Sequence, residues 1–293
     1  FNLITFIKLK KKIPISVVIP TLGGKRLEKT LNYLSKSTVF PSEILIVLPK
    51  QVKLKLNKIG TIKKNIKLIY TNKKNQVLQR IEGFKKTKMK IVVQMDDDIL
   101  ISKNCLQKLY VGIKNNDNIA IAPSFSSNRR VSKIYKKPNT RFLKLYHWLI
   151  NSNKGFDPGT IALSGFNYGD ENRLHGEREQ EWLPGAMIMH KKKNLILNNF
   201  YPYNFKKCYC EDLLHSLLLR NKNIKLFKNY ETKIREISSG SIIDKNNFIS
   251  TLKAFKSEFI IRYYIVSKFK FSKIRFLIYY LIYFIRILIR HSK

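Results

Sequence analysis

The sequence predicts an α/β fold in which a mostly parallel central sheet is flanked by helices. Short runs rich in Ile and Val are stopped by Pro or Asp, which is typical of strands buried on both faces. Between these runs, apolar residues recur at three- and four-residue spacing, as in amphipathic helices. Strands that alternate with helices in this way form parallel sheets, and ligands of such sheets lie beyond the carboxyl ends of the strands.

The expected elements can be placed in order along the chain. Strands are predicted at 15–20, 44–48, 66–70, 91–95 and 119–122. Helices are predicted at 26–35, 76–85, 106–113 and 211–220. The segment 124–181 is rich in Gly, Asn and Ser, which favours a functional lid or mobile segment, and strand character returns at 182–189. We therefore expect a catalytic domain over 13–250 and a basic, aromatic-rich helical extension over 251–293.

The charge of the chain is strongly positive. Lys and Arg total 57 against 19 acidic residues, which gives a net charge of +38 over 293 residues. Such a chain attracts polyanions and anionic lipid. Scattered Lys among Asn and Ile also fits a compositional bias with solvated faces, and both interpretations stay open. The three cysteines do not form a disulfide framework, and no cleavable signal peptide is expected, which favours a cytoplasmic location.

The C-terminal segment combines aromatic and basic residues. Residues 276–285 are all apolar or aromatic, and Arg275 and Arg286 flank them. A bilayer span needs ~20 apolar residues, so a helix lying on an anionic membrane surface fits better. A helix that packs on the catalytic domain is the alternative. The first interpretation predicts a protein bound peripherally to the inner face of the cytoplasmic membrane.

Two acidic motifs indicate the chemistry. Asp96, Asp97 and Asp98 follow a buried strand, and adjacent carboxylates repel one another unless a cation compensates. Mg²⁺ and Mn²⁺ prefer such oxygen ligands and bridge to substrate phosphates, although a helix cap is the simpler alternative. Glu211 and Asp212 begin a predicted helix, where the dipole alone favours acids, but such a residue could also deprotonate an acceptor hydroxyl.

Four motifs, taken together and in this order, resemble the family-2 glycosyltransferases of the GT-A fold. They occupy residues 17–21, 93–98, 182–186 and 210–213, and the resemblance covers roughly residues 13 to 230. It implies a Rossmann-like GT-A fold and a nucleotide-diphosphate sugar as donor, usually a UDP-sugar.

The resemblance also implies roles for individual residues. Asp98 would hold a divalent metal, Mn²⁺ or Mg²⁺, on the diphosphate, and Asp212 would be the catalytic base, supported by Glu211. Trp182 and Gly185 would shape the acceptor side. The nucleotide sugar would be bound by Pro20, Thr21, Gln76, Arg80, Asp96 and Asp97.

The chain departs from the family pattern at two places. Leu48-Pro49-Lys50 stands where members usually have an acidic pair that reads the base. Many members also have a His ligand to the metal after the Glu-Asp helix, and here Glu236 is the candidate replacement. The identity of the base and the full set of metal ligands therefore stay open.

The predicted activity is metal-dependent transfer of a sugar, with inversion, to a glycan or lipid-linked acceptor in cell-envelope polysaccharide or glycolipid synthesis. One alternative is a nucleotidyltransferase of similar fold, because residues 21–26 form a Gly-containing basic loop after the first strand. Another is a non-enzymatic polyanion-binding protein. Nucleic acid is not the expected partner, because the Lys residues are dispersed and no recognised nucleic-acid motif is present.

Overall fold

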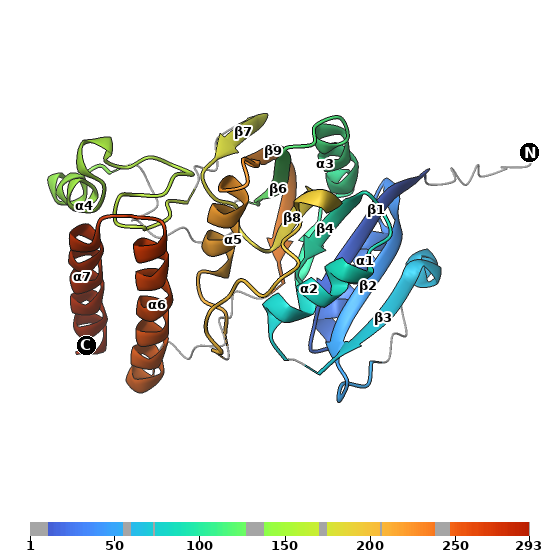
Figure 1. The fold of residues 1–293 in the computed structure, drawn as a ribbon, viewed down its shortest axis with the longest axis horizontal. Coiled ribbons are helices and arrows are strands. Elements are labelled where there is room, and N and C mark those ends of the chain that lie inside the picture. The colour runs from blue at the N-terminus through green and yellow to red at the C-terminus, as the bar shows by residue number, and fades with distance from the viewer. Residues whose placement is uncertain are drawn as a thin grey trace, which may run out of the picture.

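The computed structural model describes residues 11–54, 60–72, 74–126, 138–169, 175–205, 207–237 and 247–292. Within these ranges, nine strands form one sheet in the order β3-β2-β1-β4-β8-β6-β9-β5, and β7 pairs with β9 (Figure 1). The strands are β1 Lys11–Pro20, β2 Val39–Pro49, β3 Ile66–Thr71, β4 Ile91–Met95, β5 Ile99–Ile101, β6 Ile119–Phe125, β7 Glu177–Gln180, β8 Met187–Lys191 and β9 Lys225–Glu236. The α-helices are α1 Lys25–Ser35, α2 Gln76–Lys86, α3 Cys105–Ile113, α4 Arg141–Asn151, α5 Glu211–Arg220, α6 Phe248–Lys268 and α7 Lys273–His291, and short 3₁₀ turns occupy Gly60–Asn65, Ser152–Lys154 and Lys192–Asn194.

The predicted α/β fold class is confirmed. Strands β3, β2, β1 and β4 are parallel, with Val17 in register with Ile44 on one side and Val93 on the other. Strand β8 runs antiparallel between β4 and β6, and β6 then pairs parallel with β9. Because β1 and β4 point the same way, their carboxyl ends bring Pro20 and Met95 to one edge of the sheet.

Helices cover both faces of the parallel strands. On one face α1 buries Leu27, Leu31 and Leu34, spaced as one side of a helix, against alternate residues of the strands. On the other face α2 approaches so closely that a Cβ at Gly83 would lie 2.3 Å from Val18 Cγ1. Only glycine lets this helix reach the sheet, and the first residues of α2 are thereby held at the carboxyl edge of the strands.

The segment between β6 and β8 differs from the expectation. The predicted strand at 182–189 begins only at Met187, so residues 182–186 form a loop. The irregular segment 124–181 contains α4 and β7, which the sequence analysis did not predict, and its residues 127–137 and 170–174 lie outside the described residues. Strand β9 was also not predicted, because its Lys, Asn and Glu residues obscure the alternating pattern that marks a half-buried strand.

The C-terminal residues form a hairpin of two helices. Helix α6 packs against α2 and α5 through a shared apolar cluster that includes Val77, Leu213 and Ile261. Helix α7 packs on α6 and on α4 (Figure 1). Neither helix, nor any other in the described residues, is long and apolar enough to cross a bilayer. The division into a domain over 13–250 and an extension over 251–293 stays a prediction.

Candidate active site

The candidate site begins at the turn after β1. The Thr21 backbone N–H donates to Val47 O at 2.9 Å, and the Thr21 hydroxyl donates to the Asp97 carboxylate. From α2, Gln79 Nε2 donates to the carbonyl oxygens of Thr21 and Val47, each at 3.0 Å. Pro20 and Thr21 are buried, so this turn is fixed by neighbouring elements rather than by solvent-exposed contacts.

The three aspartates after β4 point to different partners. The Asp96 N–H donates to Ala186 O at 2.9 Å, which continues the pairing of β4 with β8. Asp97 turns toward Thr21, and its carbonyl accepts from the Thr30 hydroxyl at 2.9 Å. The Asp98 carboxylate lies 4.0 Å from Arg26 Nη1, and its side chain is 22% exposed. Asp97 is thus held in place by Thr21 and Thr30, while the side chain of Asp98 is partly exposed.

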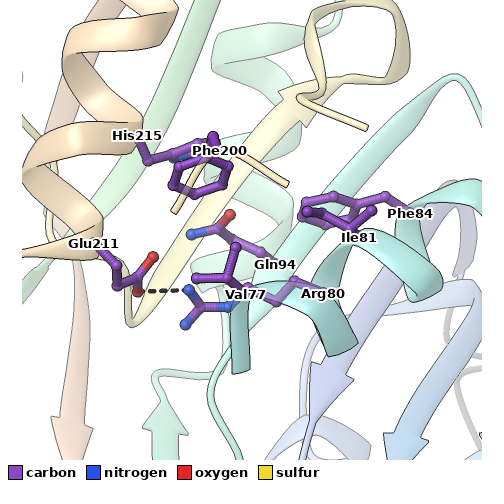
Figure 2. Close-up of a pocket in the computed structure, with 8 residues that line it drawn as sticks. All are labelled: Val77, Arg80, Ile81, Phe84, Gln94, Phe200, Glu211 and His215. Atoms are coloured by element: carbon purple, nitrogen blue, oxygen red, sulfur yellow. Dashed lines mark hydrogen bonds and ion pairs between the residues drawn. The ribbon is translucent and has the colours of Figure 1, made fainter. Parts of the chain in front are cut away.

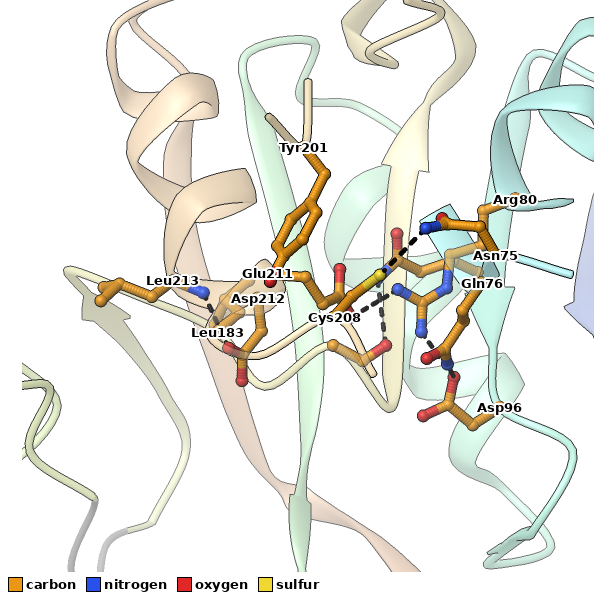
Figure 3. Close-up of polar contacts among 12 residues, drawn as sticks. Asn75, Gln76, Arg80, Asp96, Leu183, Tyr201, Cys208, Glu211, Asp212 and Leu213 are labelled. Atoms are coloured by element: carbon orange, nitrogen blue, oxygen red, sulfur yellow. Dashed lines mark hydrogen bonds and ion pairs between the residues drawn. The ribbon is translucent and has the colours of Figure 1, made fainter. Parts of the chain in front are cut away.

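Arg80 links the first aspartate to helix α5 (Figure 3). Its Nη2 lies 2.6 Å from Asp96 Oδ1, and its Nη1 lies 2.5 Å from Glu211 Oε1. Gln76, at the start of α2, also donates to Asp96 Oδ1 at 2.8 Å. Burial by itself would lower the pKa of Arg80, but the carboxylates of Glu211 and Asp96 raise it, so the guanidinium stays charged. One cation therefore holds both Asp96 and Glu211, which lie 16 and 131 positions from Arg80 in the sequence.

The carboxyl groups of Asp96 and Asp97 have raised pKa values. Burial raises the pKa of Asp96 to about 7. The charge of Arg80 lowers this pKa, but the negative charges of Glu211 and Asp98 act against it. Burial likewise raises the pKa of Asp97, and the neighbouring Asp98 charge adds to the effect. A raised carboxyl pKa means that the surroundings disfavour further negative charge, and a bound cation would relieve this.

Helix α5 begins with the second acidic motif. Its N-cap, Cys210, has φ 51°, a left-handed backbone conformation that turns the chain sharply into the helix. Asp212 follows in the first turn, where burial and the Glu211 charge raise its pKa to about 6. A carboxylate with this pKa is ionised at neutral pH and is a stronger base than a free aspartate, which suits proton abstraction.

The loop at 182–186 runs directly past the start of α5. Gln94 Nε2 donates to Gly185 O at 3.0 Å, and a Cβ at Gly185 would lie 2.7 Å from Glu211 Oε1 and 3.4 Å from Asp212 Cβ. Trp182 is anchored elsewhere, because its Nε1 donates to Tyr168 O at 2.7 Å. The structure thus brings Gly185 to the acidic pair, while the acceptor-side role of Trp182 and Gly185 stays a prediction.

A small cavity lies behind Arg80 (Figure 2). It is lined by Val77, Arg80, Ile81, Phe84, Gln94, Phe200, Glu211 and His215. Its volume of about 10 Å³ is the space of a single water, far below the several hundred Å³ of a typical ligand pocket. This cavity is therefore too small to hold a substrate or an organic cofactor.

The donor set suits a hard divalent cation that is shared with a substrate. Among the described residues, no three His, Cys, Asp or Glu side chains converge into a metal cluster. Mg²⁺ commonly takes one or two carboxylates and completes its shell with water and phosphate oxygens, so Asp98 beside Asp96 fits this pattern. Glu236 pairs with Ile99 across β5 and β9, which brings it near Asp98 in the sheet.

Several residues of the site were missed by sequence reasoning. Gln79 holds the turn at Thr21, and Gln94 holds the loop at Gly185. The one local pattern that could have indicated either residue is the polar Gln94 within the apolar run of β4. Arg262 is buried in α6, donates to Gly165 O at 2.8 Å, and lowers the pKa of Asp212 through its charge. No pattern near Arg262 in the sequence indicated this, because the contact depends on how α6 packs against the rest of the protein.

Comparison with known proteins identifies the family of the chain and supports its fold. The model of the family "Glycosyl transferase family 2" matches residues 16–167. A crystal structure of GalNAc-T7 with UDP, GalNAc and Mn²⁺ has a similar fold, with a TM-score of 0.52 and 14% identity over 76% of this chain and 43% of that chain. TarS from S. aureus gives a TM-score of 0.48 and 16% identity over 78% of this chain and 37% of that one.

The chain thus spans less than half the length of either solved structure. No curated protein matches it in sequence. The family match covers more than half of the chain, including the second half of β1, the three aspartates and Arg80. The protein belongs to glycosyl transferase family 2.

Proposed function

We propose that the protein transfers a sugar from a nucleotide-diphosphate sugar, with a UDP-sugar as the first candidate, to an acceptor hydroxyl with inversion at the anomeric carbon. One observation carries the proposal above the others. Arg80 binds both Asp96, on the donor side, and Glu211, beside the base candidate Asp212. One cation thus joins two acidic motifs that are far apart in the sequence, which supports a single reaction centre.

On the donor side, Pro20, Thr21, Gln76 and Asp97 shape the edge on which the nucleotide would lie, and Arg80 holds Asp96 in place. Arg80 is 4% exposed, so it acts on the donor mainly through Asp96. Asp98 would hold Mn²⁺ or Mg²⁺, which when bound neutralises charge on the leaving diphosphate. The Mn²⁺ in the GalNAc-T7 structure supports this role for a metal.

On the acceptor side, Asp212 takes the proton from the hydroxyl as its oxygen attacks the anomeric carbon. The new carbon–oxygen bond forms on the face opposite the diphosphate, whose bond to that carbon breaks, so the configuration inverts. Glu211 is fixed by Arg80 and cannot approach the acceptor freely, which leaves Asp212 as the base. Trp182 and Gly185 would border the acceptor.

We further propose a glycan or lipid-linked acceptor and a role in cell-envelope polysaccharide or glycolipid synthesis at the cytoplasmic side of the membrane. The net charge of +38 supports association with anionic surfaces and phosphorylated substrates. Nucleic acid is not proposed as a partner, and the catalytic part is taken as residues 13–250.

The test is incubation of the protein with UDP-sugars and Mn²⁺, with detection of released UDP. Asp98→Ala should abolish metal-dependent donor binding, since it removes the expected protein ligand. Asp212→Asn should retain donor binding and lose turnover by about 10²-fold or more. As a matched control, Asp117→Asn changes an exposed aspartate paired with Lys193 and should leave both properties unchanged.

Two results would contradict the proposal. Release of pyrophosphate instead of the nucleoside diphosphate would indicate a nucleotidyltransferase. Turnover by Asp212→Asn at the parent rate would exclude Asp212 as the base.

A further inference from the structure

We propose that the outward sides of α4 and α7 form a docking surface for an anionic phospholipid bilayer. We call it the α4–α7 face and define it by Phe142, Leu145, Trp148, Ile274, Leu277 and Leu281. The inference concerns a surface remote from Asp98 and Asp212, so it stands or falls independently of the proposed reaction.

Helix α7 has two apolar sides, one buried and one exposed. Its inner side buries Phe276 and Tyr280 in a cluster that also contains residues of α4. Its outer side exposes Ile274, Leu277 and Leu281 to 73%, 53% and 60%, and their spacing of three and four residues places them in one stripe. A helix that is already packed on one side needs no second apolar stripe for folding, so the outer stripe indicates contact with something else.

Helix α4 adds a second exposed stripe. Phe142, Leu145 and Trp148 recur every three residues and are each 47% exposed or more. Arg275, in the first turn of α7, donates to Trp148 O at 2.8 Å, and its guanidinium lies 5.8 Å from the Trp148 ring centroid. This contact joins the end of α4 to the beginning of α7 and brings the two stripes together. Figure 1 shows both helices at one end of the molecule, with α6 between α7 and α5.

The charges around the α4–α7 face select an anionic partner. Neither helix contains an Asp or Glu. Exposed cations lie beside the apolar stripes at Arg141, Lys144 and Lys273. Apolar and aromatic side chains with basic neighbours are typical of helices that lie in the interface of an anionic bilayer.

A second copy of the chain is a poorer occupant of this face. In a twofold dimer the same surface meets itself, so the basic residues of both copies would be brought close together without any acid from α4 or α7 to pair with them. Anionic headgroups compensate these cations, while the acyl region accepts side chains such as Leu281 and Phe142. Since α6 and α7 pack firmly on the protein, such docking would also fix its orientation relative to the bilayer.

The experiment is flotation of the full chain with vesicles of phosphatidylcholine alone or mixed with phosphatidylglycerol. The parent protein should float only with the anionic vesicles, and added salt should weaken binding by screening. Leu281→Glu should weaken binding by about tenfold or more, because a charge replaces an inserted apolar side chain. Val111→Glu is the matched control, since Val111 is 57% exposed on α3, and it should bind like the parent.

A second measurement does not depend on whether Leu281→Glu folds, because it leaves the α4–α7 face unchanged. The chain has two Trp residues, so in Trp182→Phe the emission of Trp148 reports its own surroundings. Anionic vesicles should shift this emission to shorter wavelength. Absence of the shift together with absence of flotation would overturn the proposal, as would equal binding of Leu281→Glu and the parent. A parent dimer that Leu281→Glu dissociates would assign the face to a second copy instead.

Discussion

The substitution Arg80→Met removes the cation between Asp96 and Glu211 while keeping an unbranched side chain in the apolar surroundings. Arg80 is 4% exposed, and the side chains of Asp96 and Glu211 are 24% and 12% exposed. Each lost hydrogen bond to a charged group costs about 1.5–3 kcal/mol. Removing one partner of a buried ion pair costs about 3–5 kcal/mol. The loss of the two hydrogen bonds, to Asp96 and to Glu211, gives a destabilisation of similar size.

This loss can be expressed as a melting temperature. An unfolding entropy of about 2.1 cal/mol/K per residue gives about 0.6 kcal/mol/K for 293 residues. We therefore expect Arg80→Met to lower the Tm of the ligand-free protein by about 5–8 °C at neutral pH. Thermal unfolding followed by circular dichroism measures the shift.

The stability loss caused by Arg80→Met should depend on pH through the protonation of Asp96. Burial raises the pKa of Asp96 to about 7, and loss of Arg80 would raise it further. A carboxyl whose pKa is raised on folding binds protons more tightly in the folded state, so its penalty is full above that pKa and is relieved as pH falls. The stability difference between Arg80→Met and the parent should therefore shrink as the pH is lowered from about 9 toward 7, and it should change little below 7, where Asp96 becomes protonated in both proteins.

The matched control is Arg26→Met. Arg26 is also an arginine near the aspartates, but its side chain is 58% exposed and lies 4.0 Å from Asp98. Its loss should change stability by no more than about 0.5 kcal/mol. Arg80→Met within about 1 °C of the parent, or as harmless as Arg26→Met, would refute the reasoning that this buried cation holds the two acidic motifs together.

Three further outcomes follow from the site. Burial raises the pKa of Asp212 to about 6, so kcat/KM should rise with pH and level off above about 6, and an acidic limb near pH 4 would contradict this. Gly185→Ala should lower kcat because its Cβ would meet Glu211 Oε1 at 2.7 Å, whereas Gly112→Ala makes an equally close glutamate contact in α3 and should leave kcat unchanged. Gly83→Ala should destabilise the protein by about 1–3 kcal/mol in urea unfolding, because the added methyl would overpack the face between α2 and the sheet.

Much of the architecture follows from local patterns. The runs at 15–20, 44–48 and 91–95 are continuous and apolar because parallel strands are buried on both faces, and all three are strands in the structure. Helix α5 begins at Glu211, as its apolar spacing and acidic first turn predicted. Strand β9 and helix α4 were not predicted, because charged residues interrupt the one and the other lies within a segment of irregular composition.

The candidate site divides in the same way. The residue types alone indicated Asp96 to Asp98 and the pair Glu211 and Asp212, since adjacent acids after a strand or at a helix start are visible in the sequence. That Arg80 joins these motifs was not visible, because the link spans 131 positions and depends on α2 and α5 meeting across the sheet edge. Periodicity reports which side of an element is buried, but not which element covers it.

The C-terminal hairpin gives the same lesson on a larger scale. The apolar and aromatic composition of 276–285, flanked by Arg275 and Arg286, was enough to indicate a helix too short to span a bilayer. Only the packing of α7 on α4 and α6 decided which of its two apolar sides is buried and which is exposed beside Trp148. Composition fixes the chemistry that a segment can offer, whereas contacts between distant segments decide where that chemistry faces.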